Sequence, residues 1–439
     1  MNEIITTLET LRPILSPTTF RQLAIMIEAT LAMSGRVTME GLSRWTEKGG
    51  SYRTVQRFFN ETHEWSQWRW LLIKSQLSEK LLGVWILIAD EVVITKAGKH
   101  THGLGKFFSS IQNQPVPGLC FLSLALLNVD SKKSYPLVVE QLVREEAKES
   151  APKAVKNKTS TGKVGRPKGS KNKNHADVEL SAFQLQLQGC IRQALGLIGC
   201  AIKLDYLGYD GALGNNAGLQ MVRQTGLHLI SKMRHDSSLY FPYEGEYSGK
   251  GKPRKYGDKL TLERLKPEHL RAESVEKHIK TETYQVQVWH KNFPALLNVV
   301  VIVKTSLKTG RTAKVLLFSD DLSLMYDKLV DYYQLRFQIE FNFRDAKQYW
   351  GLEDFMNTKE TQVSNAANFA LFMVTFSQLL LPQIKGLESN SMLDLKTVFR
   401  ARKYTRRIIN SLGIKSEEFL IDDRIFQAAE IGRIHAKAA

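Results

Sequence analysis

The sequence predicts an α/β protein, because runs typical of buried strands are followed by segments of helical periodicity. Residues 84–89 (Val-Trp-Ile-Leu-Ile-Ala) form a continuous apolar run, and residues 118–129 and 135–139 supply two further strands. A helix over residues 180–197 and a strand over 201–209 come next. Three early strands ahead of the first core helix are the basis of the fold prediction.

Length and charge limit the kind of protein. A chain of 439 residues predicts two or three domains, and 43% hydrophobic residues are ample for globular cores. The formal net charge of +17 indicates a polyanionic partner, for which nucleic acid is the first interpretation and a membrane surface the second. Polar residues interrupt the longest apolar run, residues 366–381, so we expect a buried core helix there and no membrane association.

The three cysteines, Cys120, Cys190 and Cys200, contain no Cys-x-x-Cys pair. This spacing predicts neither a disulfide framework nor a zinc site, and it favours a reducing compartment. We therefore expect a cytoplasmic protein.

Two short helices near the N-terminus resemble a helix-turn-helix. Thr38 and Ser51 are predicted to cap them, and a pair of glycines separates them. The second helix would expose Arg53, Gln56 and Arg57, which can contact phosphates or base edges in a major groove. The alternative is a plain helical bundle, since helix pairs with a glycine turn are common.

Two aspartates follow predicted strands. Asp90 comes directly after the apolar run 84–89, and Asp210 comes after the strand 201–209 and before a glycine turn and a new helix. Asp205 competes with Asp210, but it lies inside the strand on the same side as Lys203, as a solvated edge position would. Asp90 and Asp210 are the preferred candidates.

A basic insertion lies between residues 150 and 176. Residues 151–174 hold seven lysines and Arg166 with no acidic residue, a composition that cannot bury a core and predicts mobility. The segment around Arg166 and Lys168, Gly-Arg-Pro-Lys-Gly, resembles an AT-hook that enters an A·T minor groove. The alternative is a basic loop that adheres to phosphates.

A β-rich insertion is predicted for residues 235–318, which contain the alternating run Tyr-Gln-Val-Gln-Val-Trp that ends at Trp289. After it, Ser319, Asp320 and Asp321 are interpreted as capping the next helix.

That next segment, residues 332–350, carries the functional prediction. On one α-helix, Tyr333, Arg336, Glu340 and Lys347 would project within a sector of about 60°. A second stripe has the spacing of a face buried against a core: Tyr332, Leu335, Ile339, Phe343, Ala346 and Trp350. The helix would thus be anchored while it presents a carboxylate flanked by cations. An ordinary surface ion pair between Arg336 and Glu340 is the alternative.

The spacing Tyr-x2-Arg-x3-Glu-x6-Lys resembles the Tyr-Arg-Glu-Lys signature of the insertion-sequence-four family of bacterial DDE transposases. The resemblance implies a ribonuclease-H-like catalytic fold in which Asp90, Asp210 and Glu340 hold two Mg²⁺ ions, which Mn²⁺ can replace. It further implies that Arg336 and Lys347 hold DNA phosphates. Tyr333 and Arg336 would lie near a flipped base during hairpin formation. Trp289 would either receive that base or serve as packing.

The resemblance also implies a domain plan: a helical DNA-binding domain (1–78), a catalytic core (79–234 and 319–384) interrupted by the two insertions, and a C-terminal helical region (385–439). The expected activity is cut-and-paste transposition of double-stranded DNA with terminal inverted repeats, by a homodimer associated with the bacterial nucleoid. A non-catalytic DNA-binding regulator and a structure-specific nuclease on the same fold are the alternatives.

Overall fold

The computed structural model describes residues 2–46, 49–76, 83–109, 113–144, 175–247, 249, 251–384, 386–387, 391–412, 418–432 and 434. The chain folds into two compact units that do not follow chain order. Unit 1 contains Met1–Leu142, Gly189–Leu204 and Leu335–Ala439, and unit 2 contains Val143–Gln188 and Asp205–Gln334. The predicted basic insertion, with Arg166 and Lys168, lies outside the described residues.

Unit 1 begins with a group of helices. They are α1 (Asn2–Leu8), α2 (Pro17–Ala32), α3 (Met39–Trp45), α4 (Tyr52–Asn60) and α5 (Trp65–Gln76). The caps predicted at Thr38 and Ser51 are confirmed, because each side chain accepts a hydrogen bond from a backbone amide in the first turn of α3 and α4. Ser16 caps α2 in the same way. These side chains fix where each helix begins.

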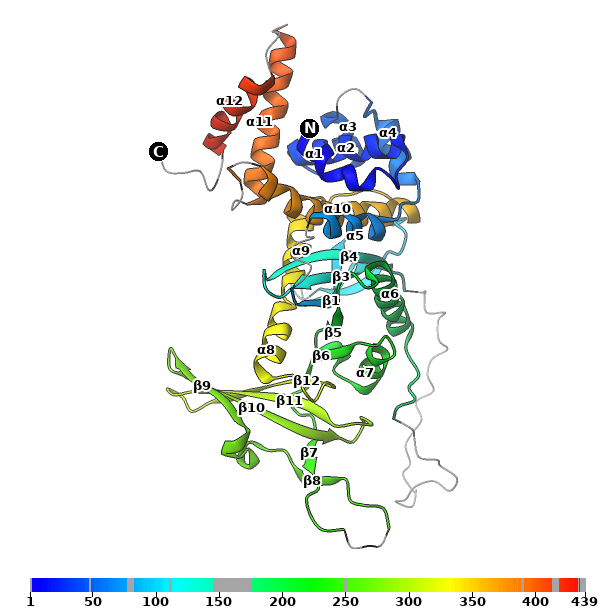
Figure 1. Cartoon of the computed structure of the whole chain (residues 1–439). Coiled ribbons are helices and arrows are strands. Elements are labelled where there is room, and N and C mark those ends of the chain that lie inside the picture. Colours follow the sequence, from blue (N-terminus) through cyan, green and yellow to red (C-terminus); the bar gives the residue numbers. More distant parts are fainter. Residues whose placement is uncertain are drawn as a thin grey trace. The chain divides into compact units, whose positions relative to one another are not determined.

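The sheet of unit 1 is antiparallel. Its strands are β1 (Trp85–Thr95), β2 (Gly105–Ser109), β3 (Gln114–Asn128) and β4 (Lys133–Leu142), and β3 pairs with each of the other three. Helix α5 packs on β4, as do α9 (Gln338–Gln348) and α10 (Glu360–Leu380), and Figure 1 shows these helices beside the strands. The sheet and its helices form the core of unit 1.

The position of Asp90 corrects one prediction. The strand does not end at Asp90, because β1 continues to Thr95 and Asp90 pairs in register with Ser123 of β3. The residues after Asp90 and Glu91 are β-branched, and β3 offers them backbone partners as far as Gly118. A single polar pair therefore interrupts the apolar pattern without ending the strand.

Helix α10 is the predicted core helix. It is long and apolar enough to span a membrane, but 89% of its apolar window is buried inside the protein. The prediction of a buried core helix over residues 366–381 is therefore confirmed.

Unit 2 is built on a mixed sheet. Its strands are β5 (Leu204–Gly208), β6 (His228–Met233), β7 (Leu239–Pro242), β8 (Tyr256–Lys259), β9 (Leu270–Glu276), β10 (Ile279–His290), β11 (Leu297–Ser306) and β12 (Thr312–Ser319). β5 and β6 are parallel, and antiparallel pairing continues in the order β6-β12-β11-β10-β7-β8, with β9 also on β10. The α/β prediction is confirmed, and the predicted β-rich insertion contains β7 to β12.

The segment 332–350 is not one helix, which corrects the prediction of a single continuous face. Helix α8 (Tyr326–Leu335) belongs to unit 2 as far as Gln334, and a separate helix, α9, begins at Gln338 in unit 1. Between them, the amides of Ile339 and Glu340 bond to carbonyls three residues earlier, those of Arg336 and Phe337. This tighter 3₁₀ geometry interrupts the α-helical ladder, so Tyr333 and Glu340 belong to different helices.

Candidate active site

A cation joins two of the predicted catalytic carboxylates in unit 1. The Arg336 Nη1 atom donates to Asp90 Oδ2 at 3.0 Å, and Nη2 lies 3.8 Å from Glu340 Oε1. The side chains of Arg336 and Asp90 are 13% and 22% exposed, whereas that of Glu340 is 43% exposed. Asp90 and Glu340 thus share one largely buried guanidinium although they are 250 positions apart in the sequence.

The pKa of Glu340 reflects both its burial and its charged neighbours. Burial raises the pKa of Glu340; the nearby Arg336 guanidinium opposes this, and the negative charge of Asp90 adds to it. The net pKa is above the ordinary value for glutamate. A carboxylate that is partly desolvated beside a second one favours the binding of a further positive charge.

Glu340 is held in place by the buried face of its helix. Ile339 and Phe343 are buried on either side of it in the sequence, as the predicted stripe requires. The Asn342 amide donates to Ser134 Oγ at 2.8 Å, and that hydroxyl donates to the carbonyl of Gln338 at 2.9 Å. These bonds fix α9 against β4, so Glu340 has a defined orientation over the sheet.

Lys347 ties the same helix to β1. Its Nζ atom donates to the carbonyl oxygen of Val93 at 3.0 Å and lies 2.9 Å from Glu353 Oε1. Val93 is three residues after Asp90 on β1. Lys347 therefore sets the spacing between the strand of Asp90 and the helix of Glu340.

Asp210 and Tyr333 lie in unit 2. Asp210 follows β5 and caps a 3₁₀ turn, since its carboxylate accepts from the amide of Ala212 at 2.8 Å, and its carbonyl accepts from Ser231 Oγ at 2.5 Å. Its place just after a strand and before a glycine turn agrees with the sequence prediction. Tyr333 is half-buried on α8, and Asp205 lies within β5.

The donor chemistry of Asp90 and Glu340 fits a divalent cation such as Mg²⁺, which prefers carboxylate oxygens. Burial is the main cause of the raised pKa of Glu340, and the negative charge of Asp90 adds to it, so a bound cation would stabilise both carboxylates. Among the residues that the structure describes, no group of three His, Cys, Asp or Glu side chains gathers to hold a metal ion.

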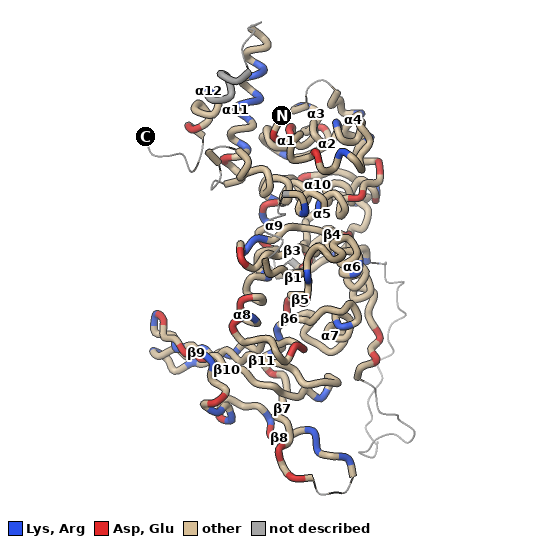
Figure 2. The backbone as a smooth tube through the Cα atoms, viewed as in Figure 1, with Lys and Arg blue, Asp and Glu red and all other residues tan. Residues whose placement is uncertain are grey.

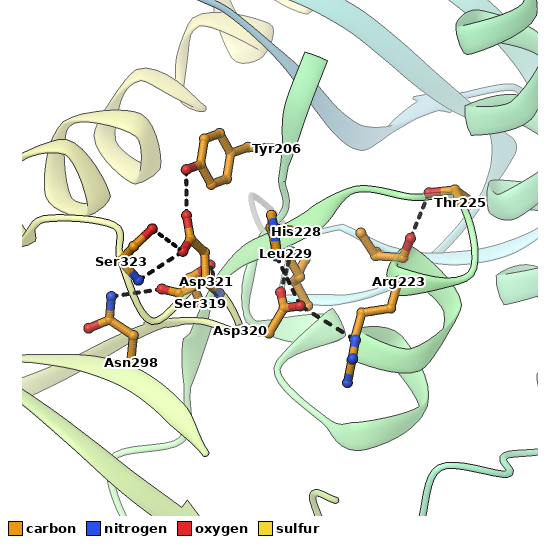
Figure 3. Close-up of polar contacts among 11 residues, drawn as sticks. Tyr206, Arg223, Thr225, His228, Leu229, Asn298, Ser319, Asp320, Asp321 and Ser323 are labelled. Atoms are coloured by element: carbon orange, nitrogen blue, oxygen red, sulfur yellow. Dashed lines mark hydrogen bonds and ion pairs between the residues drawn. The ribbon is translucent and has the colours of Figure 1, made fainter. Parts of the chain in front are cut away.

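Unit 2 contains an acidic pair whose role the sequence did not predict (Figure 3). The Asp320 carboxylate accepts from the amide of Leu229 at 3.0 Å and lies 3.1 Å from His228 Nδ1 and 3.6 Å from Arg223 Nε. Asp321 accepts from the Tyr206 hydroxyl at 2.7 Å. These contacts join β12 to β5 and β6.

This arrangement corrects the prediction that Ser319, Asp320 and Asp321 cap the next helix. Helix α8 begins only at Tyr326, and Asp321 instead closes a local turn by accepting from the amide and hydroxyl of Ser323. Burial raises the pKa of Tyr206, and its hydrogen bond to the Asp321 carboxylate raises it further. The carboxylates of Asp320 and Asp321 therefore bind donors on the neighbouring strands β5 and β6, and they do not cap α8, which begins further along the chain.

Helix α4 is the second helix of the predicted helix-turn-helix, and its polar side chains lie on two adjacent stripes of its surface. Gln56 and Tyr52 line a pocket of about 580 Å³ together with Met356 and other residues of the segment before α10. Arg53 and Arg57 are exposed on the adjacent stripe. In this structure the two arginines are therefore more open to a polyanion than Gln56 is.

Trp289 is half-buried at the end of β10. The Lys255 ammonium lies 3.4 Å from the centroid of its ring, and Tyr256 meets the ring edge-on at a centroid distance of 6.4 Å. One face of the indole is thus covered by a cation of the same unit, as expected for a packing role.

Helix α11 (Met392–Ser411) carries several basic residues, the blue segments on this helix in Figure 2, and two of its arginines have partners within unit 1. Arg400 donates to the carbonyls of Ala32 and Met33 at 3.1 Å each, and Arg402 forms an ion pair with Glu3 at 2.8 Å. Since these carbonyls end α2 and Glu3 is in α1, the arginines fasten α11 to the N-terminal helices.

The fold and site define an α/β protein with paired acidic side chains on a strand and a helix. A family model described as "DDE superfamily endonuclease" matches residues 10–293, which include both Asp90 and Asp210 and end before Glu340. The match covers more than half of the chain, so the protein belongs to the DDE superfamily endonucleases. No curated protein matches the chain in a sequence comparison.

Membership of this family suggests a nuclease with a DNA substrate, and such enzymes normally use divalent metal ions. The mixed α/β architecture is consistent with a ribonuclease-H-like fold.

Proposed function

We propose that the protein is a DNA transposase that cleaves DNA at the inverted-repeat ends of a mobile element and transfers the freed strands. The observation that supports this most is the approach of Asp90 and Glu340 to a shared guanidinium, in a chain of the DDE family that carries the Tyr-Arg-Glu-Lys spacing. A generic nuclease gives no reason for that spacing.

Asp90 and Glu340 would hold the catalytic metal ions, with Asp210 as the third ligand. When bound, divalent ions supply an activated nucleophile and neutralise charge at the scissile phosphate. The protein residues orient these carboxylates: the β1–β3 pairing positions Asp90, and α9 positions Glu340. Lys347 keeps the strand and helix at a fixed separation through Val93.

The finer assignment is to the insertion-sequence-four group, with a hairpin intermediate. Here Arg336 and Tyr333 grip a displaced nucleotide, a deformation that costs a few kcal/mol. Arg336→Ala should then allow the first nick but stall the attack on the second strand, so nicked DNA accumulates on a denaturing gel. Equal slowing of both steps would assign Arg336 to general phosphate binding.

The partners follow from the activity and the charge. Double-stranded DNA, as inverted-repeat ends and as target, would contact the helix-turn-helix-like helices through Arg53, Gln56 and Arg57, and the AT-hook-like segment through Arg166 and Lys168. The net charge of +17 supports such contacts. Pairing of two ends calls for a homodimer, which we place on the bacterial nucleoid in the cytoplasm.

The function is tested by carboxylate substitution. Asp90→Asn, Asp210→Asn and Glu340→Gln should each abolish Mg²⁺-dependent cleavage of end DNA and leave DNA binding nearly intact. Asp205→Asn is the matched control and should cleave normally. Cleavage that survives Asp210→Asn but fails with Asp205→Asn would move the assignment to Asp205.

A further inference from the structure

Arg336 contacts both Asp90 and Glu340, the two carboxylates that would hold a metal ion in the proposed function. Its guanidinium donates to Asp90 at 3.0 Å and approaches Glu340 at 3.8 Å. A guanidinium stays protonated in proteins, so a change of pH cannot remove its charge. To give up the two carboxylates, the side chain must move.

We propose that Arg336 is an internal counter-ion that competes with divalent metal for Asp90 and Glu340, and that a DNA phosphate releases it. The inference rests on the proposed function, because it assumes that these carboxylates are the metal ligands. It adds an order of assembly: DNA binds first, and the metal ions bind tightly only afterwards.

The competition follows from charge and geometry. A Mg²⁺ ion binds carboxylate oxygens at about 2.0–2.1 Å and demands octahedral geometry. The Asp90 Oδ2 atom already accepts a hydrogen bond from the Arg336 guanidinium. A metal ion bound to the same carboxylate would also be repelled by the positive charge of that guanidinium. Metal binding without displacement of Arg336 is therefore weakened.

The position of Arg336 in the chain allows the displacement. Arg336 lies in the tight turn between α8 and α9, outside the regular ladder of either helix. Its side chain can change partners while its carbonyl keeps its bond to the amide of Ile339. A DNA phosphate offers a guanidinium two parallel charge-assisted hydrogen bonds, a stronger hold than one carboxylate contact.

The two basic residues of α9 have different partners from those of Arg336. Lys347 is bound to Val93 and Glu353, and Arg344 pairs with Asp345 at 2.9 Å. None of these partners is a proposed metal ligand. Arg344→Ala is therefore a matched control, because it removes the same charge from the neighbouring helix α9 without touching the carboxylates of the site.

The test measures Mn²⁺ binding to the full-length protein by paramagnetic resonance of the free ion, with and without end DNA. Without DNA, Arg336→Ala should bind Mn²⁺ about tenfold more tightly than the unaltered protein. Arg336→Lys, which keeps the charge but loses the planar fork, should fall between them, and Arg344→Ala should match the unaltered protein. With end DNA bound, the difference caused by Arg336→Ala should shrink.

Two substitutions separate this inference from the proposed function. If Asp90→Asn and Glu340→Gln leave Mn²⁺ binding unchanged, the metal site itself is wrong and the inference fails with it. If the two carboxylate substitutions weaken Mn²⁺ binding but neither Arg336→Ala nor Arg336→Lys tightens it, the metal site is supported. The proposed competition between Arg336 and the metal is then overturned. If Arg336→Ala still binds Mn²⁺ more tightly than the unaltered protein by the same factor when end DNA is bound, the proposal that a DNA phosphate releases Arg336 is overturned.

Discussion

Each unit of the protein places two carboxylates close together, and their partners differ. In unit 1, Asp90 and Glu340 share the guanidinium of a long side chain in a turn. In unit 2, Asp320 and Asp321 accept from donors fixed by neighbouring strands, such as the Leu229 amide and the Tyr206 hydroxyl. We propose that the first pair exchanges one cation for another, whereas the contacts of the second pair tie strands of the fold together. The groups that contact a pair of carboxylates thus indicate more about the role of the pair than the mere presence of two acidic residues does.

Substitutions in the two pairs should affect cleavage to very different extents. Asp90→Asn or Glu340→Gln should lower the rate of Mg²⁺-dependent end cleavage by about a thousandfold or more, because a lost metal ligand removes several kcal/mol of transition-state stabilisation. Asp321→Asn should keep most of the activity at a temperature where the variant is folded. Comparable losses from both substitutions in a single-turnover assay would erase the distinction between the two pairs.

The second prediction concerns stability. Asp320→Ala leaves the Leu229 amide without its acceptor at a position where the aspartate side chain is only 6% exposed. A donor stranded in this way costs about 2 kcal/mol, so the midpoint of urea unfolding should fall. Asp90→Asn should unfold near the original midpoint, because asparagine retains an oxygen for Arg336. A midpoint unchanged by Asp320→Ala would show that this contact is not structural.

The third and smallest effect is on pH dependence. Burial alone would raise the pKa of Asp321, but the hydrogen bonds from Tyr206 and Ser323 outweigh it, and the net pKa is below the ordinary value. A depressed pKa stabilises the fold above the unfolded pKa, about 3.8 for aspartate, and this stability is lost as the pH falls through the folded pKa. Asp321→Asn should therefore flatten the loss of stability below about pH 4. An identical acid profile would assign the loss to other carboxylates.

Local features of the fold were predictable from the sequence. The caps at Ser16, Thr38 and Ser51 depend on residues within one turn, and the strands over 118–129 and 135–139 and the core helix over 366–381 depend on runs of apolar residues. Such signals need no knowledge of the rest of the chain. They were sufficient to predict the α/β class.

Features that depend on distant partners were not predictable. Arg336 contacts Asp90 across 246 positions, and the arginines of α11 bind α1 and α2 from the other end of the chain. The break between α8 and α9 follows no proline or glycine, so no local signal marked it. For the candidate site, the sequence supplied the identities of Asp90 and Glu340, but not the cation that joins them.

The most direct test of the account is exchange of a metal-binding oxygen for sulfur. Glu340→Cys replaces a hard carboxylate ligand by a thiolate, which binds Mg²⁺ poorly and softer ions better. The account predicts that Glu340→Cys loses end cleavage in Mg²⁺ and regains part of it in Mn²⁺ or Cd²⁺, while Asp345→Cys on the same helix gains nothing from the exchange. Full cleavage by Glu340→Cys in Mg²⁺ would contradict the claim that Glu340 is a catalytic metal ligand.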